Sequence, residues 1–217
     1  MIRYECTALV FSKAPVPGTV KTRLSPAVNE TDAAQIYKGL VERTLNMISA
    51  VDNLGVQLWC TPVIDHPFFL ECREKYELDL YLQCGGNLGD RMQAAIKETL
   101  WGDNSVLVIG CDCPELQAED LSTARDKLRS GYDVVLGPSE DGGYYLIGMK
   151  ELNPEIFRGI SWGGATVLGE TRNRIAKMGL SCYELPVHWD VDDGDDLARY
   201  LSGRNNTEKQ AGVDDTD

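Results

Sequence analysis

Histidine, long apolar runs and positive charge are all scarce in this sequence of 217 residues. There are two histidines and seven cysteines, with no C-x-x-C pair. The C-x-C pair Cys111/Cys113 is a weak metal signal without a companion cluster. An odd number of cysteines predicts reduced thiols and a cytoplasmic protein. No apolar run approaches the ~20 residues of a membrane span, and the apolar stretch near the N-terminus is too short for a signal peptide.

Acidic residues outnumber basic ones by 34 to 21, so the formal net charge is -13. This balance argues against nucleic acid as a partner, because binding to a phosphate backbone relies on a basic surface. It does not exclude a small anionic ligand, since one basic loop can oppose the global field locally. Apolar residues make up 43% and charged residues 25%, which is ordinary composition for a globular protein.

Short apolar runs alternate with segments of helical periodicity along most of the chain. The expected strands lie at 7–11, 56–60, 78–83, 105–110, 132–137, 143–149 and 181–187, and the expected helices at 31–49, 88–100, 118–130 and 165–179, with a last helix after 192. This alternation predicts an α/β fold with a mostly parallel sheet covered on both faces. We expect one domain over residues 1–203 and a disordered tail over 204–217.

In such sheets ligands bind beyond the carboxyl ends of the strands, so the loops after strands are the places to search. The first, "SKAPVPGTVKTRL", contains Lys13, Lys21 and Arg23 and no acidic residue. These cations are suited to phosphate oxygens, and Gly18 permits a tight turn against an anion. The loop lacks the full P-loop pattern, so its phosphate geometry must differ. A solvated basic loop is the alternative interpretation.

Two further loops are acidic. Asp112 follows the most apolar strand, which makes it either a ligand for a hard cation such as Mg²⁺ or Mn²⁺ or a turn residue. The segment "HWDVDDGDDL" places five aspartates within seven residues, a crowding that requires a balancing cation or helix N-terminus. Asp190 and Asp192 alternate with Val191 and could project together as metal ligands. We expect the other end of this segment, Asp195 and Asp196, to serve the start of the last helix.

A fourth loop, "GPSEDGGYYLIG", holds Asp141 before two glycines. This aspartate is either held at a ligand or part of a hairpin turn, because D-G is a strong turn signal. In a fifth, "QCGGNLGDRM", Gln83, a glycine-rich turn and Arg91 precede a helix. That arrangement suits recognition of a base or ribose, and a simple turn at a helix start explains it nearly as well.

The motifs "KAPVPGTVKTRL", "GCDCPEL", "GPSEDGGYYLIG", "ISWGGATVL" and "WDVDDGDDL" resemble, in this order, the glycosyltransferase family DUF2064 of the nucleotide-diphospho-sugar transferase superfamily. The resemblance covers about residues 7–201. It implies a GT-A fold, which is a Rossmann-like three-layer sandwich, and the use of a nucleotide and a divalent cation, Mg²⁺ or Mn²⁺. Relatives include guanylyltransferases of the molybdenum-cofactor and phospholactate type.

The resemblance also implies roles for individual residues. Those expected to bind the nucleotide are Lys13, Gly18, Lys21, Arg23, Gln83, Gly89 and Arg91, and those expected to hold the metal are Asp112, Asp192 and Asp190. The chain departs from the family pattern at two places. Asp193 and Gly194 stand where the family usually has Thr-Pro, and Gly163 follows Trp162 where the family often has Ser or Thr.

Two reactions fit this set of residues. A glycosyltransferase would transfer a sugar from a nucleotide-sugar donor to a small acceptor, and a nucleotidyltransferase would transfer a nucleotide from an NTP to a small phosphorylated acceptor. We assign catalytic roles to Asp141, which would bind or deprotonate the acceptor hydroxyl, and to Lys21 in the phosphate loop. A catalytically silent nucleotide-binding module is a third possibility, and it would bind nucleotide without depending on metal.

Overall fold

One continuous mixed sheet forms the centre of the protein. The computed structural model describes residues 4–25, 27–102 and 104–211. Within these residues the sheet has seven strands: β1 (Cys6–Lys13), β2 (Gly55–Thr61), β3 (Asp79–Leu82), β4 (Ser105–Ile109), β5 (Val134–Pro138), β6 (Tyr144–Met149) and β7 (Cys182–Glu184). The sequence analysis located all seven to within a few residues.

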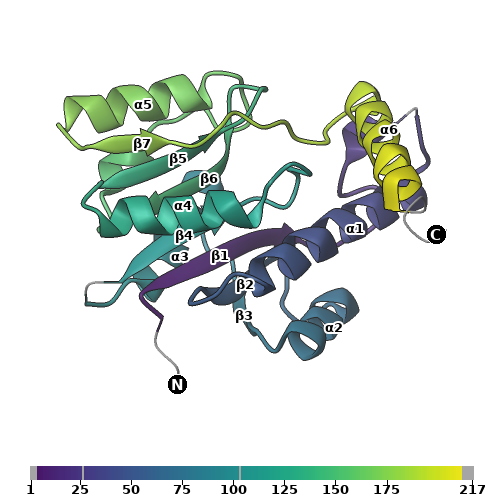
Figure 1. The fold of residues 1–217 in the computed structure, drawn as a ribbon, viewed down its shortest axis with the longest axis horizontal. Coiled ribbons are helices and arrows are strands. Elements are labelled where there is room, and N and C mark those ends of the chain that lie inside the picture. Colours follow the sequence, from purple (N-terminus) through teal and green to yellow (C-terminus); the bar gives the residue numbers. More distant parts are fainter. Residues whose placement is uncertain (1–3, 26, 103, 212–217) are drawn as a thin grey trace, which may run out of the picture.

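The strand order is β3-β2-β1-β4-β6-β5-β7. All strands run in the same direction except β6, which is antiparallel to both of its neighbours. The carboxyl ends of β1, β4, β5 and β7 therefore lie along one edge of the sheet, at the right of Figure 1. The fold class predicted from the sequence, an α/β sandwich with a mostly parallel mixed sheet, is confirmed.

Helices cover both faces of this sheet. The residues that the structure describes form six helices, α1 (Glu30–Ser49), α2 (Pro67–Tyr76), α3 (Leu88–Thr99), α4 (Ala118–Arg129), α5 (Val167–Lys177) and α6 (Gly194–Ala211), with short 3₁₀ turns η1 (Thr22–Leu24) and η2 (Pro154–Ile156). Buried residues of α1, α2 and α4 pack with one face of the sheet, and those of α3 and α5 with the other. This is the three-layer arrangement expected from alternating strands and helices.

Helix α2 is absent from our sequence-based expectations. It is only ten residues long, and its three buried residues are Phe68, Phe69 and Cys72. The ring of His66 accepts a hydrogen bond from the backbone N–H of Phe68 and so caps the helix start. Histidine is not among the preferred N-cap residues, so this start has no recognisable sequence signal.

Helix α6 lies beyond the carboxyl ends of the strands, beside the start of α1 (Figure 1). It packs through Leu197 with Trp189 and Val191 in a small core shared with α1 and η1. The helix continues through Ala211, so residues 204–211 of the expected tail are helical, and residues 212–217 lie outside the described residues. No described helix is long and apolar enough to cross a membrane.

Asp195 and Asp196 lie in the first turn of α6, as expected, and the structure adds Asp193 to the helix start. Asp193 is the capping residue, because its Oδ1 accepts the backbone N–H groups of Asp195 and Asp196 at 2.9 and 3.1 Å. Asp196 reaches back and accepts the N–H groups of Asp192 and Asp193. This reciprocal capping box uses Asp193, the residue at which the chain departs from the family pattern, to fix the turn after Asp192.

Candidate functional site

The basic loop between β1 and α1 folds back over the carboxyl end of β1. Lys13 is the last residue of that strand, and its ammonium donates to the carbonyl oxygen of Thr19 at 2.7 Å, which braces the loop from within. Gly18 has a φ of +75°, and a Cβ there would stand 3.0 Å from a carboxylate oxygen of Glu30. The tight turn predicted at Gly18 is present, and its close neighbour within the chain is an acidic side chain.

Lys21 connects this loop to two of the predicted metal ligands. Its Nζ lies 2.8 Å from Oδ1 of Asp112 and 3.1 Å from Oδ1 of Asp192. The Lys21 side chain is only 5% exposed, and its backbone adopts the left-handed conformation with φ 49°. That conformation is costly for a non-glycine residue.

The environment of Lys21 keeps its ammonium charged. Burial by itself lowers the pKa of Lys21, but the charges of Asp112 and Asp192 and the hydrogen bonds to them raise it above its usual value. Arg23 adds a second cation, with Nη2 2.5 Å from Oδ2 of Asp192. Residues from β1, η1 and the loops after β4 and β7 thus meet at a cavity of about 290 Å³, lined by Lys13, Thr19, Val20, Lys21, Thr22, Arg23, Tyr37, Asp112 and Asp192.

Asp190 belongs to the same acidic group, although it does not line this cavity. Burial is the main cause that raises the pKa of Asp190 to about 7. The negative charges of three other aspartates add to this rise: Asp112, Asp141 and Asp192. The loops after β4, β5 and β7 therefore bring their carboxylates close enough to interact electrostatically.

Asp141 is held by its own turn. Its Oδ1 accepts hydrogen bonds from the hydroxyl of Ser139 and from the backbone N–H of Gly143, the latter at 2.9 Å. Gly142, between them, has a φ of +85°, and a Cβ there would stand 2.1 Å from the carbonyl oxygen of Ala165. The turn thus packs against the segment before α5 and leaves Oδ2 of Asp141 outside these two contacts.

Gln83 and Arg91, which we expect to contact the base and ribose, follow β3 in the chain, and Gln83 lies near the carboxyl ends of β1 and β2. The amide of Gln83 donates to the carbonyl oxygens of Ser12 and Trp59, so it ties the ends of β1 and β2 together. Nε of Arg91 lies 3.4 Å from the carbonyl oxygen of Gly85. Within the described part of the chain, neither side chain is hydrogen-bonded or ion-paired to Lys21 or to the site aspartates. Their predicted nucleotide contacts stay predictions.

Gly89 has a packing role that the sequence did not reveal. A Cβ on Gly89, at the start of α3, would stand 2.5–2.7 Å from atoms of the Trp162 ring. Trp162 in turn stacks on the buried ring of Phe157 at 6.5 Å. The segment "ISWGGATVL" therefore lies against the start of α3, and this contact requires glycine at position 89.

Tyr37 is a site residue that sequence reasoning missed, because its helical spacing marked it only as part of the core. Its hydroxyl accepts the backbone N–H of Lys13 at 2.9 Å and lies 3.2 Å from Oγ of Ser12. Burial, the first cause, raises the pKa of Tyr37 above its usual value. The phenol stays neutral and fixes the end of β1 where the basic loop begins.

The carboxylates fit a hard divalent cation in their chemistry. Asp112 and Asp192 already converge on one positive charge, that of Lys21, and Asp190 experiences both of their charges. Carboxylate oxygens are the donors that Mg²⁺ and Mn²⁺ prefer. Within the described residues, however, no three His, Cys, Asp or Glu side chains are gathered closely enough to hold a metal. A cation shared by these aspartates would require Lys21 to move aside.

Comparisons with known proteins show the family and the fold of this chain. The profile of a family described as an uncharacterized protein conserved in bacteria (DUF2064) matches residues 44–164. A crystal structure from Desulfovibrio desulfuricans G20, provisionally assigned as a nucleotide-diphospho-sugar transferase, is 31% identical, with a TM-score of 0.80 over 88% of this chain and 84% of the other. No curated protein matches the chain.

Two more distant structures share the fold alone. CMP:2-keto-3-deoxy-manno-octonic acid synthetase complexed with CTP has 10% identity and a TM-score of 0.58, covering 93% of this chain and 99% of the other. Glucosyl-3-phosphoglycerate synthase from Mycobacterium tuberculosis, in complex with Mn²⁺, UDP and glucosyl-3-phosphoglycerate, has 12% identity and a TM-score of 0.55, covering 86% and 72%. These structural neighbours are glycosyl and nucleotidyl transferases.

Proposed function

This chain belongs to the DUF2064 family, and from that premise we propose that it is a metal-dependent transferase that uses a nucleotide-diphospho-sugar donor and a small acceptor. The observation that carries the proposal is the meeting of Lys21, Arg23, Asp112 and Asp192 at one cavity beyond the ends of the strands. A transferase of this class needs cations for the phosphates and carboxylates for a metal at adjacent positions. Here both sets are in contact.

The phosphate groups of the donor would enter the cavity beside the basic loop. At about 290 Å³ it is at the small end of ligand cavities, which suits a diphosphate with the nucleoside and sugar outside it. The ammonium of Lys21 and the guanidinium of Arg23 would exchange an aspartate partner for phosphate oxygens, with charge-assisted hydrogen bonds in both states. Lys13, which lines the same cavity, adds a third positive charge.

Asp112, Asp192 and Asp190 would hold the divalent cation once Lys21 has turned toward the phosphates. When bound, that cation would neutralise the negative charge that develops on the leaving diphosphate. Asp190 must lose its proton to act as a ligand, and its pKa of about 7 allows this near neutral pH. The protein itself contributes position and electrostatics, which are the main sources of catalysis in such transfers.

Asp141 would take the proton of the acceptor hydroxyl. The acceptor oxygen forms a bond to the anomeric carbon, the bond from that carbon to the diphosphate oxygen breaks, and the nucleoside diphosphate leaves with the bonding electrons. With Ser139 and Gly143 both donating to Oδ1, the turn presents Oδ2 of Asp141 as the accepting atom. The accepted proton then passes to solvent when the products leave.

Thermal unfolding with nucleotide-sugars and NTPs, each with and without Mn²⁺, tests this proposal. A ligand at 100 times its dissociation constant should add about 2.7 kcal/mol of stability, which is about 5–11 °C for a domain of this size. Asp112→Asn should remove the metal-dependent part of this stabilisation. Asp126→Asn, which changes a surface aspartate paired with Arg125 and Arg129, is the matched control.

Each outcome has a defined meaning. Metal-dependent stabilisation by nucleotide-sugars, lost in Asp112→Asn and kept in Asp126→Asn, supports glycosyl transfer and identifies the donor. Stabilisation by an NTP alone would replace the proposal by nucleotidyl transfer. Stabilisation that is the same without metal and in Asp112→Asn would indicate a silent nucleotide-binding module.

A further inference from the structure

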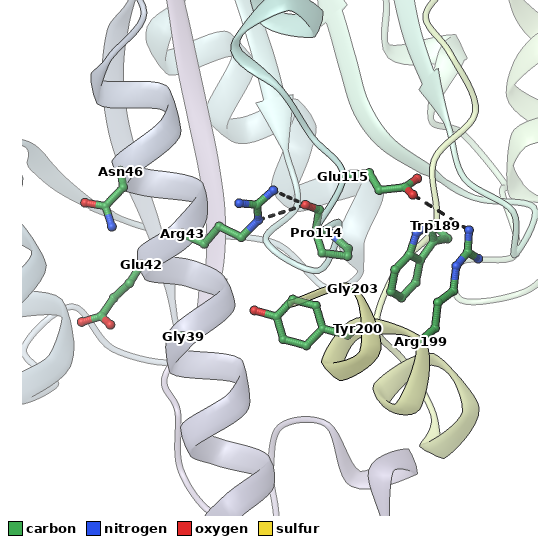
Figure 2. Close-up of a pocket in the computed structure, with 10 residues that line it drawn as sticks. All are labelled: Gly39, Glu42, Arg43, Asn46, Pro114, Glu115, Trp189, Arg199, Tyr200 and Gly203. Atoms are coloured by element: carbon green, nitrogen blue, oxygen red, sulfur yellow. Dashed lines mark hydrogen bonds and ion pairs between the residues drawn. The ribbon is translucent and has the colours of Figure 1, made fainter. Parts of the chain in front are cut away.

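Arg199, on α6, stands beside a second and larger cavity that shares no lining residue with the cavity at Lys21. This cavity of about 660 Å³ lies between α1 and α6, and Figure 2 shows Glu115, Trp189 and Arg199 together at one side of it. None of these three side chains belongs to the motif residues to which the sequence analysis gave a role. Each of the three nevertheless lies within three residues of an aspartate to which that analysis gave a role: Asp112, Asp190 or Asp196.

Arg199 contacts three different segments. Its guanidinium donates to both carboxylate oxygens of Glu140, at 2.9 and 3.4 Å. Its Cζ lies 4.2 Å from the centre of the Trp189 ring, which is buried, and its Nη2 lies 4.0 Å from Oε1 of Glu115. A planar guanidinium can make a forked ion pair at its edge and stack on an aromatic face at the same time, which a lysine cannot.

Each of these contacts lies next to a carboxylate of the candidate site. Glu140 immediately precedes Asp141, and Trp189 immediately precedes Asp190. Glu115 lies three residues after Asp112 in the same loop. The three loops that must bring aspartates together are therefore joined through one side chain on a fourth element.

Other contacts extend this connection behind the site. Oε2 of Glu115 lies 3.5 Å from Nδ1 of His188, and Nε2 of the same imidazole lies 3.0 Å from Oδ2 of the buried Asp120 on α4. From the opposite side of the cavity, the Arg43 guanidinium on α1 donates to the carbonyl oxygen of Pro114, as Figure 2 shows. The loop after Asp112 is thus held from α1, α4 and α6.

An exposed ion pair by itself usually contributes little to stability. The chain provides a comparison, because Arg172 makes a forked pair with Glu184, at 2.7 Å for both bonds, with nearly the same exposure as Arg199. That pair joins α5 to β7 and touches no loop of the site. What distinguishes Arg199 is its stacking on a buried tryptophan and its contact with three site loops.

We propose that Arg199 is a positioning residue that sets the relative positions of Asp112, Asp141 and Asp190. Like charges repel, so aspartate-bearing loops that converge need a counter-charge and a rigid support behind them. Lys21 and Arg23 supply the counter-charge, and Arg199 supplies the support from outside the ligand cavity, acting through Glu140, Glu115 and Trp189. This inference rests on the proposed function, in which these aspartates bind metal and accept a proton.

Turnover and backbone amide hydrogen exchange in Arg199→Ala, Arg199→Lys and Arg172→Ala test the inference. A displacement of about 1 Å at the reacting groups costs up to ~100-fold in rate. We therefore expect Arg199→Ala to lower kcat by about 10- to 100-fold with an unchanged KM for the donor, because the cations of the phosphate cavity are intact. Arg199→Lys should restore only part of the loss, and Arg172→Ala should keep the wild-type kcat.

Amide exchange measures the positioning directly. In Arg199→Ala it should become faster over residues 111–116, 138–143 and 188–193 and stay unchanged in α5, and Arg172→Ala should show no effect in those three segments. Equal kcat and equal exchange in the two alanine variants would overturn the role of Arg199. A wild-type protein without turnover on any donor would count against the proposed function, and the exchange comparison would still decide whether Arg199 holds the loops.

Discussion

Replacing Lys21 by methionine tests the central feature of the site, a buried ammonium between two carboxylates. Methionine keeps the length of the side chain and removes its charge. Losing one partner of a fully buried ion pair costs about 3–5 kcal/mol. The Asp112 side chain is 41% exposed and that of Asp192 26%, so water can solvate both after the change. We expect a smaller loss of about 1–2 kcal/mol, which lowers Tm by about 2–8 °C for a chain of this size.

Two further effects of Lys21→Met distinguish a functional ammonium from a merely structural one. Donor affinity should fall by about 10- to 100-fold, because a hydrogen bond to a charged group contributes about 1.5–3 kcal/mol. Mn²⁺ alone should stabilise the variant more than the wild type, because the space between Asp112 and Asp192 no longer holds a cation. Thermal unfolding with and without Mn²⁺, followed by calorimetric titration of the donor, measures both.

Lys38→Met is the matched control. Lys38 pairs with Glu71 at 3.2 Å on the surface, away from the site. The loss should stay below about 1 kcal/mol, with unchanged donor affinity. Equal stabilisation of wild type and Lys21→Met by Mn²⁺, together with equal donor affinity, would refute the argument that Lys21 occupies the place of the metal and reaches the phosphates.

Two other predictions concern pH and backbone strain. The pKa of Asp190 is raised to about 7, so the folded protein retains a proton that the unfolded chain releases. Without metal, the free energy of unfolding should therefore fall as pH rises from about 4 to 7, by up to about 1.4 kcal/mol per pH unit. Urea unfolding across this pH range should show that Asp190→Asn abolishes this fall. The same pH dependence in the wild type and in Asp190→Asn would contradict the prediction. Gly142→Ala should cost about 3 kcal/mol or more, because φ is +85° and the new Cβ would meet the carbonyl of Ala165. Gly163 has the same φ, and a Cβ there would have no neighbour within 4 Å. Thermal unfolding of Gly163→Ala should therefore show a loss of only about 1–2 kcal/mol. Similar losses in the two variants would show that the contact with Ala165 is unimportant.

Much of the fold could be predicted from local sequence patterns. The nearly continuous apolar run at Ser105–Ile109 is buried throughout as the central strand β4, as a strand covered on both faces must be. The spacing of apolar residues likewise located α1 and α3. Where the local signal was weak, prediction failed: α2 is short, begins with a histidine cap and ends with Glu77 in a left-handed conformation that glycine usually adopts.

The sequence by itself determined which loops carry charge and that these loops follow strands, because both properties are local. Only the tertiary structure decided which charges meet. Lys21 and Asp192 are 171 residues apart, and their contact depends on the order of the strands and on the path of the chain into α6. The same holds for Arg199, whose residue type and spacing mark it as an ordinary exposed arginine of a helix. Its neighbours Glu140 and Trp189 become its partners only because β5 and β7 are adjacent in the sheet, so that the loops after them meet, and because α6 packs beside α1 within reach of both loops.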